Sequence, residues 1–227
     1  MGLDMFRYGL TPQLFINMAV RLFVIFCILP IHEFAHAYTA HKLGDDTARL
    51  SGRMTLNPLA HVDPIGALMV IFVGFGYAKA VPVNMRNFKS RKQKQSMAIV
   101  SFAGPASNVI MALLLSFASN ALYYLASPHE STFPYYIMLL LEIVAEINVT
   151  LAVFNLIPIP PLDGSRIMSV LIPDKYYYQV MKYERYIMLA VFAMLFFGWL
   201  STPIAIVSGL LQTLIDTITA YPFTIIT

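Results

Sequence analysis

The sequence predicts an all-α multi-pass membrane protein with about four transmembrane helices and a small membrane-associated β-layer or re-entrant segment. Of its 227 residues, 58% are hydrophobic and only 12% are charged, whereas soluble domains carry about 25% charged residues. The mean hydropathy is +0.68. Four apolar runs also reach the roughly 20 residues that an α-helix needs to cross the hydrocarbon core of a bilayer. This composition excludes an ordinary soluble domain.

The four predicted spans follow these apolar runs. They cover roughly residues 13–41, 97–127, 134–157 and 186–215. In the first span the purely apolar part ends near residue 31, and the helix is expected to continue until Gly44, because glycine commonly ends helices.

The segment 49–87, between the first two spans, is predicted to form the β-layer or re-entrant structure. Its apolar stretch at 66–78 reads "GALMVIFVGFGYA" and is too short for a comfortable helical span. The stretch contains three glycines and many β-branched and aromatic residues, so whether it crosses the membrane is left open. No run is long or polar enough for a separate soluble domain, so residues 1–227 are interpreted as one integral membrane domain.

The basic residues predict which side of the membrane each loop occupies. Nine of the fifteen Lys and Arg residues lie between 42 and 94, and four lie between 166 and 185. Cytoplasmic loops collect Lys and Arg, so both segments are expected in the cytoplasm, and the turn "SPHESTFP" and both termini outside. The expected location is the cell membrane.

The run "NFKSRKQK" at 87–94 is the densest basic cluster. Such clusters bind either anionic lipid or nucleic acid. Its position beside an apolar span favours topology and lipid headgroups, so the expected partner is the bilayer and no nucleic acid is expected.

The sequence "HEFAH" at 32–36 lies in the cytoplasmic part of the first span. His32 and His36 are four residues apart, so on a helix they share one face and can both reach a metal ion. Glu33 is placed to act as a general base, which is the chemistry of the His-Glu-x-x-His pattern. In soluble helices the pattern also arises by chance, but ionisable groups inside a bilayer are costly and mark functional sites. A metal site is therefore predicted here.

Catalytic zinc usually has three protein ligands and one open position, so a third ligand is needed. The candidates are Asp163, His41, His61, Glu142 and Glu146. Asp163 lies in "FNLIPIPPLDGSR", whose prolines end the third span near the cytoplasmic face. The charge pattern thus places Asp163 and His36 at a similar depth, and Asp163 is the predicted third ligand.

Five motifs in this order resemble the site-2 protease family of intramembrane zinc metalloproteases. They are "HEFAH", "LSGRMTLNPLAHVDPIG", "GYAKAVPVN", "SFAGPASN" and "NLIPIPPLDGSR". The match covers most of the chain and is closest to short members without PDZ or CBS domains. The resemblance implies that His32, His36 and Asp163 hold Zn²⁺, and that Glu33 activates the water that attacks a peptide bond of a transmembrane protein substrate. It also implies that "LSGRMTLNP" and "YAKAVPVN" form the β-layer.

Asn155 is a predicted catalytic residue, placed eight residues before Asp163 to donate a hydrogen bond to the oxyanion of the reaction. The alternative is that its amide bonds the backbone freed by Pro158. Glu142 and Glu146 are one helical turn apart in the third span, and either line a path for water or face the bundle interior.

A non-proteolytic zinc transport or sensing protein is the alternative function. It has no need of a carboxylate beside the first histidine, so Glu33 favours the protease. The sequence does not predict the substrate or the oligomeric state.

Overall fold

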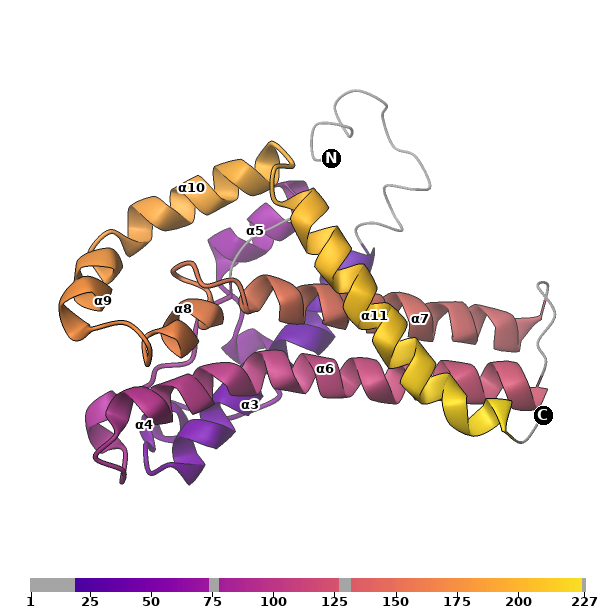
Figure 1. The fold of residues 1–227 in the computed structure, drawn as a ribbon, viewed down its shortest axis with the longest axis horizontal. Coiled ribbons are helices and arrows are strands. Elements are labelled where there is room, and N and C mark those ends of the chain that lie inside the picture. The colour runs from indigo at the N-terminus through magenta and orange to yellow at the C-terminus, as the bar shows by residue number, and fades with distance from the viewer. Residues whose placement is uncertain (1–18, 74–77, 127–131, 226–227) are drawn as a thin grey trace.

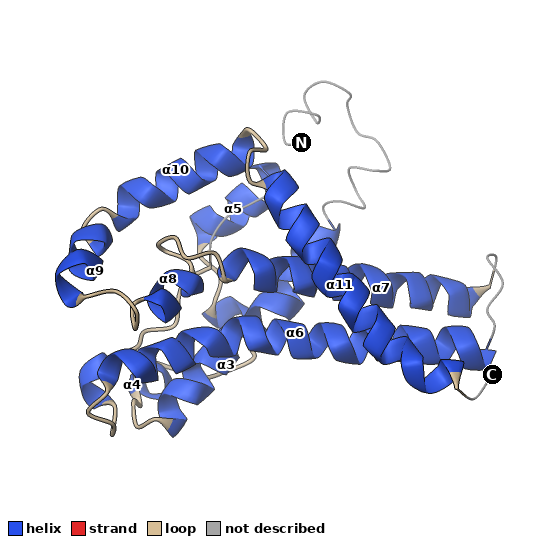
Figure 2. Ribbon diagram, in the orientation of Figure 1, coloured by secondary structure: helices blue, strands red, loops and turns tan. Residues whose placement is uncertain are grey.

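The computed structural model describes residues 19–73, 78–126 and 132–225, and every regular element in these ranges is helical (Figures 1 and 2). Four helices are long and apolar enough to cross a membrane. They are Ala19–Lys42, Gln93–Ala126, Phe133–Asn155 and Ser201–Thr224. The predicted all-α fold with four spans is confirmed, and the first three spans lie close to their predicted positions.

The first span contains the π-helical turn η1 (Val24–Ile28) followed by α3 (Leu29–Lys42). Pro30 has no backbone N–H and its ring would crowd the preceding turn, and the π-helical turn lies directly before it. The span ends where Gly44 adopts a φ of +107°. The Asp45 and Gly44 amides donate to the carbonyls of Ala40 and His41, which is a Schellman cap.

The helices α6 (Gln93–Ala126) and α7 (Phe133–Asn155) form a long antiparallel pair, and α11 (Ser201–Thr224) crosses them (Figure 1). A buried cluster joins the three helices through Ala112, Ala145, Val149 and Ile215. Small residues let helix backbones approach closely in a membrane. Helix α3 packs along the other end of α6.

The fourth predicted span, 186–215, is wrong in its position. The structure divides this run into α10 (Glu184–Phe196) and α11, and only α11 is long enough to cross. Gly198 has a φ of +77°, and the Trp199 amide donates to the Met194 carbonyl, so α10 ends in another Schellman cap. Pro203 then lies in the first turn of α11, where its missing N–H costs nothing.

The predicted β-layer over 49–87 is not found among the described residues, and neither is a re-entrant loop. The segment instead forms α4 (Thr47–Leu50), η2 (Pro58–Ala60), α5 (Pro64–Val73) and η3 (Met85–Asn87). Side-chain caps explain why. Asn57 accepts from the Leu59 amide, and Asp63 accepts from the Ile65 and Gly66 amides. Such caps start helical turns instead of strands. Residues 74–77 lie outside the described part.

Two further short helices, α8 (Asp163–Met168) and α9 (Asp174–Met181), connect α7 to α10. In Figure 1, α8 lies near α3 and α6, on the side of the bundle away from the α6–α7 turn. This arrangement brings the "HEFAH" helix and the "PPLDGSR" segment together.

Candidate active site

Three of the predicted residues meet in space. His32 and His36 come from α3, and Asp163 is the first residue of α8. The two Nε2 atoms are 3.1 Å apart, and Asp163 Oδ2 lies 3.3 Å from His32 Nε2 and 3.2 Å from His36 Nε2. Ligands at 2.0–2.1 Å from a tetrahedral zinc ion are about 3.3–3.4 Å apart. The donor atoms and their spacing therefore fit a zinc ion.

The protonation of His36 is fixed by the backbone of α6. Its Nδ1 lies 2.8 Å from the Val100 carbonyl oxygen, which can only accept, so Nδ1 carries the proton. The Nε2 atom is then free to ligate a metal, as in the usual pairing of a metal-bound histidine with a carbonyl. Both imidazoles are buried, so the lone pairs face a site with little competing water.

Asp163 reaches the histidines because the loop 156–162 folds tightly back on α7. A side chain at Gly164 would lie 2.2 Å from the Leu156 carbonyl oxygen, so only glycine permits this approach. Burial alone raises the pKa of Asp163, but the imidazoles of His36 and His32 lower it more, and its pKa lies well below the usual value. The carboxylate is thus held in the ionised form that binds metal.

Gly104 of α6 packs directly against the two imidazole rings. A methyl group placed there would lie 2.3 Å from His36 Nε2 and 2.6 Å from His32 Cε1, which is far inside van der Waals contact. Gly104 in the "FAGPASN" motif therefore leaves room for the two imidazole rings.

We expect Gly104→Ala to lower zinc occupancy and cleavage together, because the added methyl must push a ligand imidazole out of place. A 1 Å displacement of a catalytic group can cost about 100-fold in rate. Zinc content by mass spectrometry and peptide cleavage measure the two effects. Gly209→Ala is the matched control for zinc content, since a methyl there meets nothing within 4 Å. Equal zinc content in both variants would contradict the packing role.

Glu33 faces the same cavity as the metal ligands. The cavity measures about 230 Å³ and is also lined by α7, α8 and α10. Glu33 is 8% exposed, and its Oε2 accepts a hydrogen bond from the Val81 amide at 3.2 Å. This bond fixes the carboxylate beside the histidines and leaves Oε1 available for a proton. Glu33 thus has the position of a general base.

Val81 belongs to the segment 78–84, which forms neither helix nor strand and is held in place by side chains. The buried guanidinium of Arg53 donates to the Lys79 and Ala80 carbonyls at 2.9 and 3.3 Å. Together with the Glu33 contact, these side-chain bonds hold the backbone of the segment, which has no neighbouring strand among the described residues. Sequence reasoning missed both Arg53 and Val81, although the motif "YAKAVPVN" was identified.

Asp45 holds the far end of this segment. It is fully buried and accepts bonds from the Asn84 amide at 2.6 Å, the Asn87 side chain at 2.8 Å and Thr47. Burial alone raises its pKa, but the hydrogen bonds from Thr47, Asn84 and Asn87 lower it below the usual value. The ionised carboxylate therefore stabilises the fold above about pH 4, and this contribution is lost as the pH falls through the folded-state pKa.

We expect Asp45→Ala to lower the unfolding temperature by roughly 4–8 °C, since hydrogen bonds to a buried charge contribute about 2 kcal/mol. Acidification below pH 4 should also destabilise this variant less than it destabilises the wild type. Thermal unfolding in detergent at pH 7 and below pH 4 measures both effects. Asp46→Ala is the control, because Asp46 is more exposed and bonds only His41 and Arg49. Equal shifts in unfolding temperature for the two variants would contradict this stabilising role of Asp45.

Asn155 lines the cavity of the metal ligands, at the end of α7. Its Nδ2 donates to the Leu151 carbonyl at 3.0 Å, a bond within its own helix. This bond uses one of its two amide hydrogens and orients the side chain, so its predicted oxyanion role stays a prediction.

The other third-ligand candidates lie elsewhere. His41 contacts Asp46, and His61 is buried with its Nε2 2.8 Å from the Thr55 carbonyl oxygen. Glu142 and Glu146 line a different cavity. Within the described residues, His32, His36 and Asp163 form the one group of three His, Cys, Asp or Glu side chains spaced to hold a metal ion.

A bundle of apolar helices that contains a His-Glu-x-x-His helix and a third acidic ligand is the arrangement of a membrane metalloprotease. Comparison with known proteins identifies the family. The profile of "Peptidase family M50" matches residues 126–198, which include Asp163. The chain is 40% identical over 174 residues to "Putative zinc metalloprotease YwhC" of Bacillus subtilis (strain 168), covering 75% of each chain.

Two mycobacterial proteins named "Putative zinc metalloprotease Rip2" are more distant. The one from Mycolicibacterium smegmatis is 35% identical over 141 residues, and the one from Mycobacterium tuberculosis (strain H37Rv) is 30% identical over 141 residues. Each alignment covers 60% of this chain and 51% of the relative. No solved structure matches the chain. The chain belongs to peptidase family M50, the site-2 protease family, and the predicted family and enzyme class are confirmed.

Proposed function

We propose that this protein is an intramembrane zinc metalloprotease that hydrolyses peptide bonds within or near the transmembrane segments of other membrane proteins. The observation that carries the proposal is the triangle of His32, His36 and Asp163, with sides of 3.1–3.3 Å, beside the buried carboxylate of Glu33. The interpretation of residues 1–227 as a single membrane domain stays part of the proposal.

In this proposal each residue has a separate role. His32, His36 and Asp163 hold zinc, which supplies Lewis-acid polarisation of the scissile carbonyl and acidifies water. Glu33 takes the proton from the attacking water and later delivers it to the leaving amine. Asn155 donates its remaining amide hydrogen to the developing oxyanion.

The substrate must expose its backbone at this site. A helix has its carbonyls hydrogen-bonded, so a transmembrane substrate has to unwind locally before attack. The 230 Å³ cavity, with Met188, Val191 and Phe192 of α10 on its wall, supports binding of a short apolar stretch of such a chain. Gly, Pro or Asn near the cleaved bond should therefore favour cleavage.

The basic residues support an active site towards the cytoplasmic side of the cell membrane. Two connections between spans lie on the same side as the candidate metal ligands, and both are rich in Lys and Arg. They are residues 43–92, between the first and second spans, and residues 156–200, between the third and fourth. Cytoplasmic loops concentrate such residues. The proposed cleavage therefore lies in the cytoplasmic part of the substrate span.

Zinc transport or sensing is the less favoured function. A transport pathway needs ligands distributed along its length, whereas these ligand atoms converge at one point. Glu33 lies beside these three residues but is not itself one of the proposed ligands. A protease needs such a carboxylate as its general base, whereas a transporter has no use for it.

Comparative proteomics of membrane fractions tests the proposed function. Cells expressing the wild type should contain fragments of membrane proteins that are absent from cells expressing Glu33→Gln at the same level. Zinc uptake by vesicles containing either form should be equal. Identical fragments in both cells, or zinc uptake that requires Glu33, would contradict the protease.

A further inference from the structure

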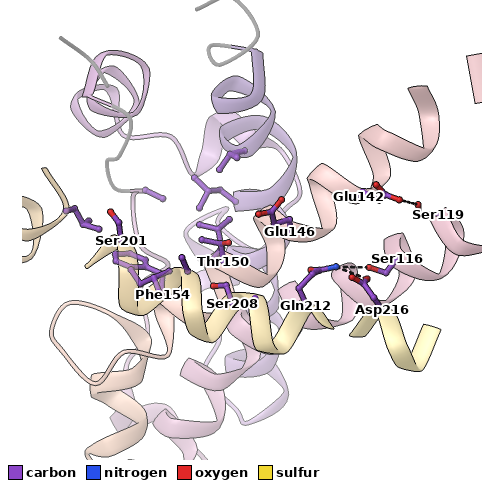
Figure 3. Close-up of a pocket in the computed structure, with 18 of the residues that line it drawn as sticks. Ser116, Ser119, Glu142, Glu146, Thr150, Phe154, Ser201, Ser208, Gln212 and Asp216 are labelled. Carbon is purple, nitrogen blue, oxygen red and sulfur yellow. Dashed lines mark hydrogen bonds between the residues drawn. The ribbon is translucent and has the colours of Figure 1, made fainter. Parts of the chain in front are cut away.

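A second and larger cavity lies between α6, α7 and α11 (Figure 3). Its volume is about 910 Å³, and its wall is apolar apart from a set of polar side chains. In Figure 3, Glu146 of α7 and Ser208 and Gln212 of α11 line the same space. The proposed chemistry at the zinc ligands uses none of these residues.

The lining of this cavity is acidic. Its described lining residues include the carboxylates of Glu142, Glu146 and Asp216 and no Lys, Arg or His. Glu142 accepts a hydrogen bond from Ser119, and Asp216 accepts one from Gln212. Glu146 makes no hydrogen bond or ion pair with any described residue, and its side chain is exposed at the wall of the cavity. Ionisable groups in transmembrane helices are costly unless water or a partner compensates them, so this carboxylate is available to a cationic ligand.

Two further oxygens in the wall also have no partner. Ser208 is 6% exposed, and its Oγ forms no hydrogen bond. Gln212 Oε1 is buried and equally without a donor, because the amide nitrogen of Gln212 points to Asp216 and Ser116. Buried polar atoms are nearly always satisfied. One carboxylate and two neutral oxygens that lack donors indicate a ligand that is cationic and rich in N–H groups.

The carboxylates are not arranged for a divalent metal ion. Among the described residues, the metal-type cluster is that of His32, His36 and Asp163, and the acidic residues of this cavity form no such group. An ammonium or guanidinium group on a flexible chain can instead contact acceptors that are spread along a wall.

The cavity adjoins the cavity of the candidate metal ligands. Leu29, Ala78, Leu151 and Phe154 line both this cavity and the cavity of the metal ligands. A peptide that passes the metal ligands would therefore extend along α7 towards Glu146. The cationic group that fits this cavity thus belongs to the polypeptide that is cleaved.

We propose that this cavity is a specificity site that binds a Lys or Arg side chain in the transmembrane segment of the substrate, with Glu146 as its main acceptor. The inference rests on the proposed function. Glu146 lies nine residues before Asn155 in α7, a distance of about 13 Å along a helix. That distance corresponds to about four residues of extended substrate or nine of helical substrate, so the basic residue should lie roughly 4–9 residues from the cleaved bond.

Binding and cleavage of designed transmembrane peptides test this proposal. The peptides carry one Lys, or Met at the same position, at each of several distances from the cleaved bond. In the inactive variant Glu33→Gln, the best Lys peptide should bind at least about tenfold more tightly than its Met partner. Adding Glu146→Gln should reduce that ratio to near one, whereas Glu184→Gln, at the start of α10 and outside both cavities, should leave it unchanged.

Cleavage by the otherwise wild-type enzyme should show the same dependence, mainly in KM. A Lys preference that survives Glu146→Gln, or no Lys preference at any position, would overturn the specificity site. A clear Lys preference in binding without any cleavage by the wild type would instead contradict the proposed protease while retaining the binding site. If Glu146→Gln reduced the cleavage of Lys and Met peptides by the same factor, Glu146 would have only a structural role and the proposal would be overturned.

Discussion

Glu33→Gln should lower the rate of peptide-bond cleavage by about 10²–10⁴-fold, the usual contribution of a general base. Glutamine preserves the size of the side chain but cannot take a proton. Its amide oxygen can still accept the hydrogen bond from the Val81 amide, so the local structure should persist. Zinc content should stay near one ion per chain, because the three ligands are intact. Purified protein in lipid vesicles, with a quenched fluorescent transmembrane peptide, measures the rate.

The control for this experiment is Glu184→Gln, a change of the same kind at the start of α10 and away from both cavities. It should keep both activity and metal. If Glu33→Gln lost its zinc, but the fraction still loaded were fully active, Glu33 would serve to build the site and another group would act as the base.

Asp163→Ala should cause the largest loss of metal. The change removes one of three ligands and leaves His32 and His36 as a pair, and three-ligand sites rarely keep their metal after such a loss. The carboxylate lies 3.2–3.3 Å from both Nε2 atoms, and no other described Asp or Glu completes a metal-type group of three with these histidines. Zinc per chain after dialysis against a weak chelator should fall to a small fraction of the wild-type value.

Asp174→Ala is the matched control, because Asp174 begins α9 and pairs with Lys94 away from the site. It should retain wild-type zinc. Full zinc retention in Asp163→Ala would overturn the choice of ligands.

The three residues of the candidate metal site could be predicted because their signals are local and chemically specific. His32 and His36 are four residues apart within a span, and Asp163 follows a proline-rich helix end at a similar depth. The structure brings these three together as expected. In contrast, the contacts of Val81 and Arg53 join residues 48 and 26 positions apart, and no local pattern encodes such pairings.

The errors in the predicted fold have physical causes of the same kind. Hydropathy alone gave one span over 186–215, because it does not detect that Gly198 adopts a left-handed conformation and breaks the helix. The glycines and the β-branched and aromatic residues of 66–78, together with the family resemblance, predicted a β-layer or re-entrant segment over 49–87, but Asn57 and Asp63 cap helical turns there. The contact of Gly104 with the two imidazole rings was not predicted, because the motif "SFAGPASN" contains a glycine but does not show which side chains lie against it.

The position of the cut in a membrane-embedded substrate tests the central claim most directly. The wild-type enzyme in lipid vesicles is given a transmembrane peptide, and mass spectrometry determines the ends of the products. The proposed function predicts a cut inside the apolar segment, within a few turns of its cytoplasmic end, that is absent with Glu33→Gln. A cut confined to the polar flanking residues, or no cut by enzyme that holds zinc, would contradict intramembrane proteolysis by this site.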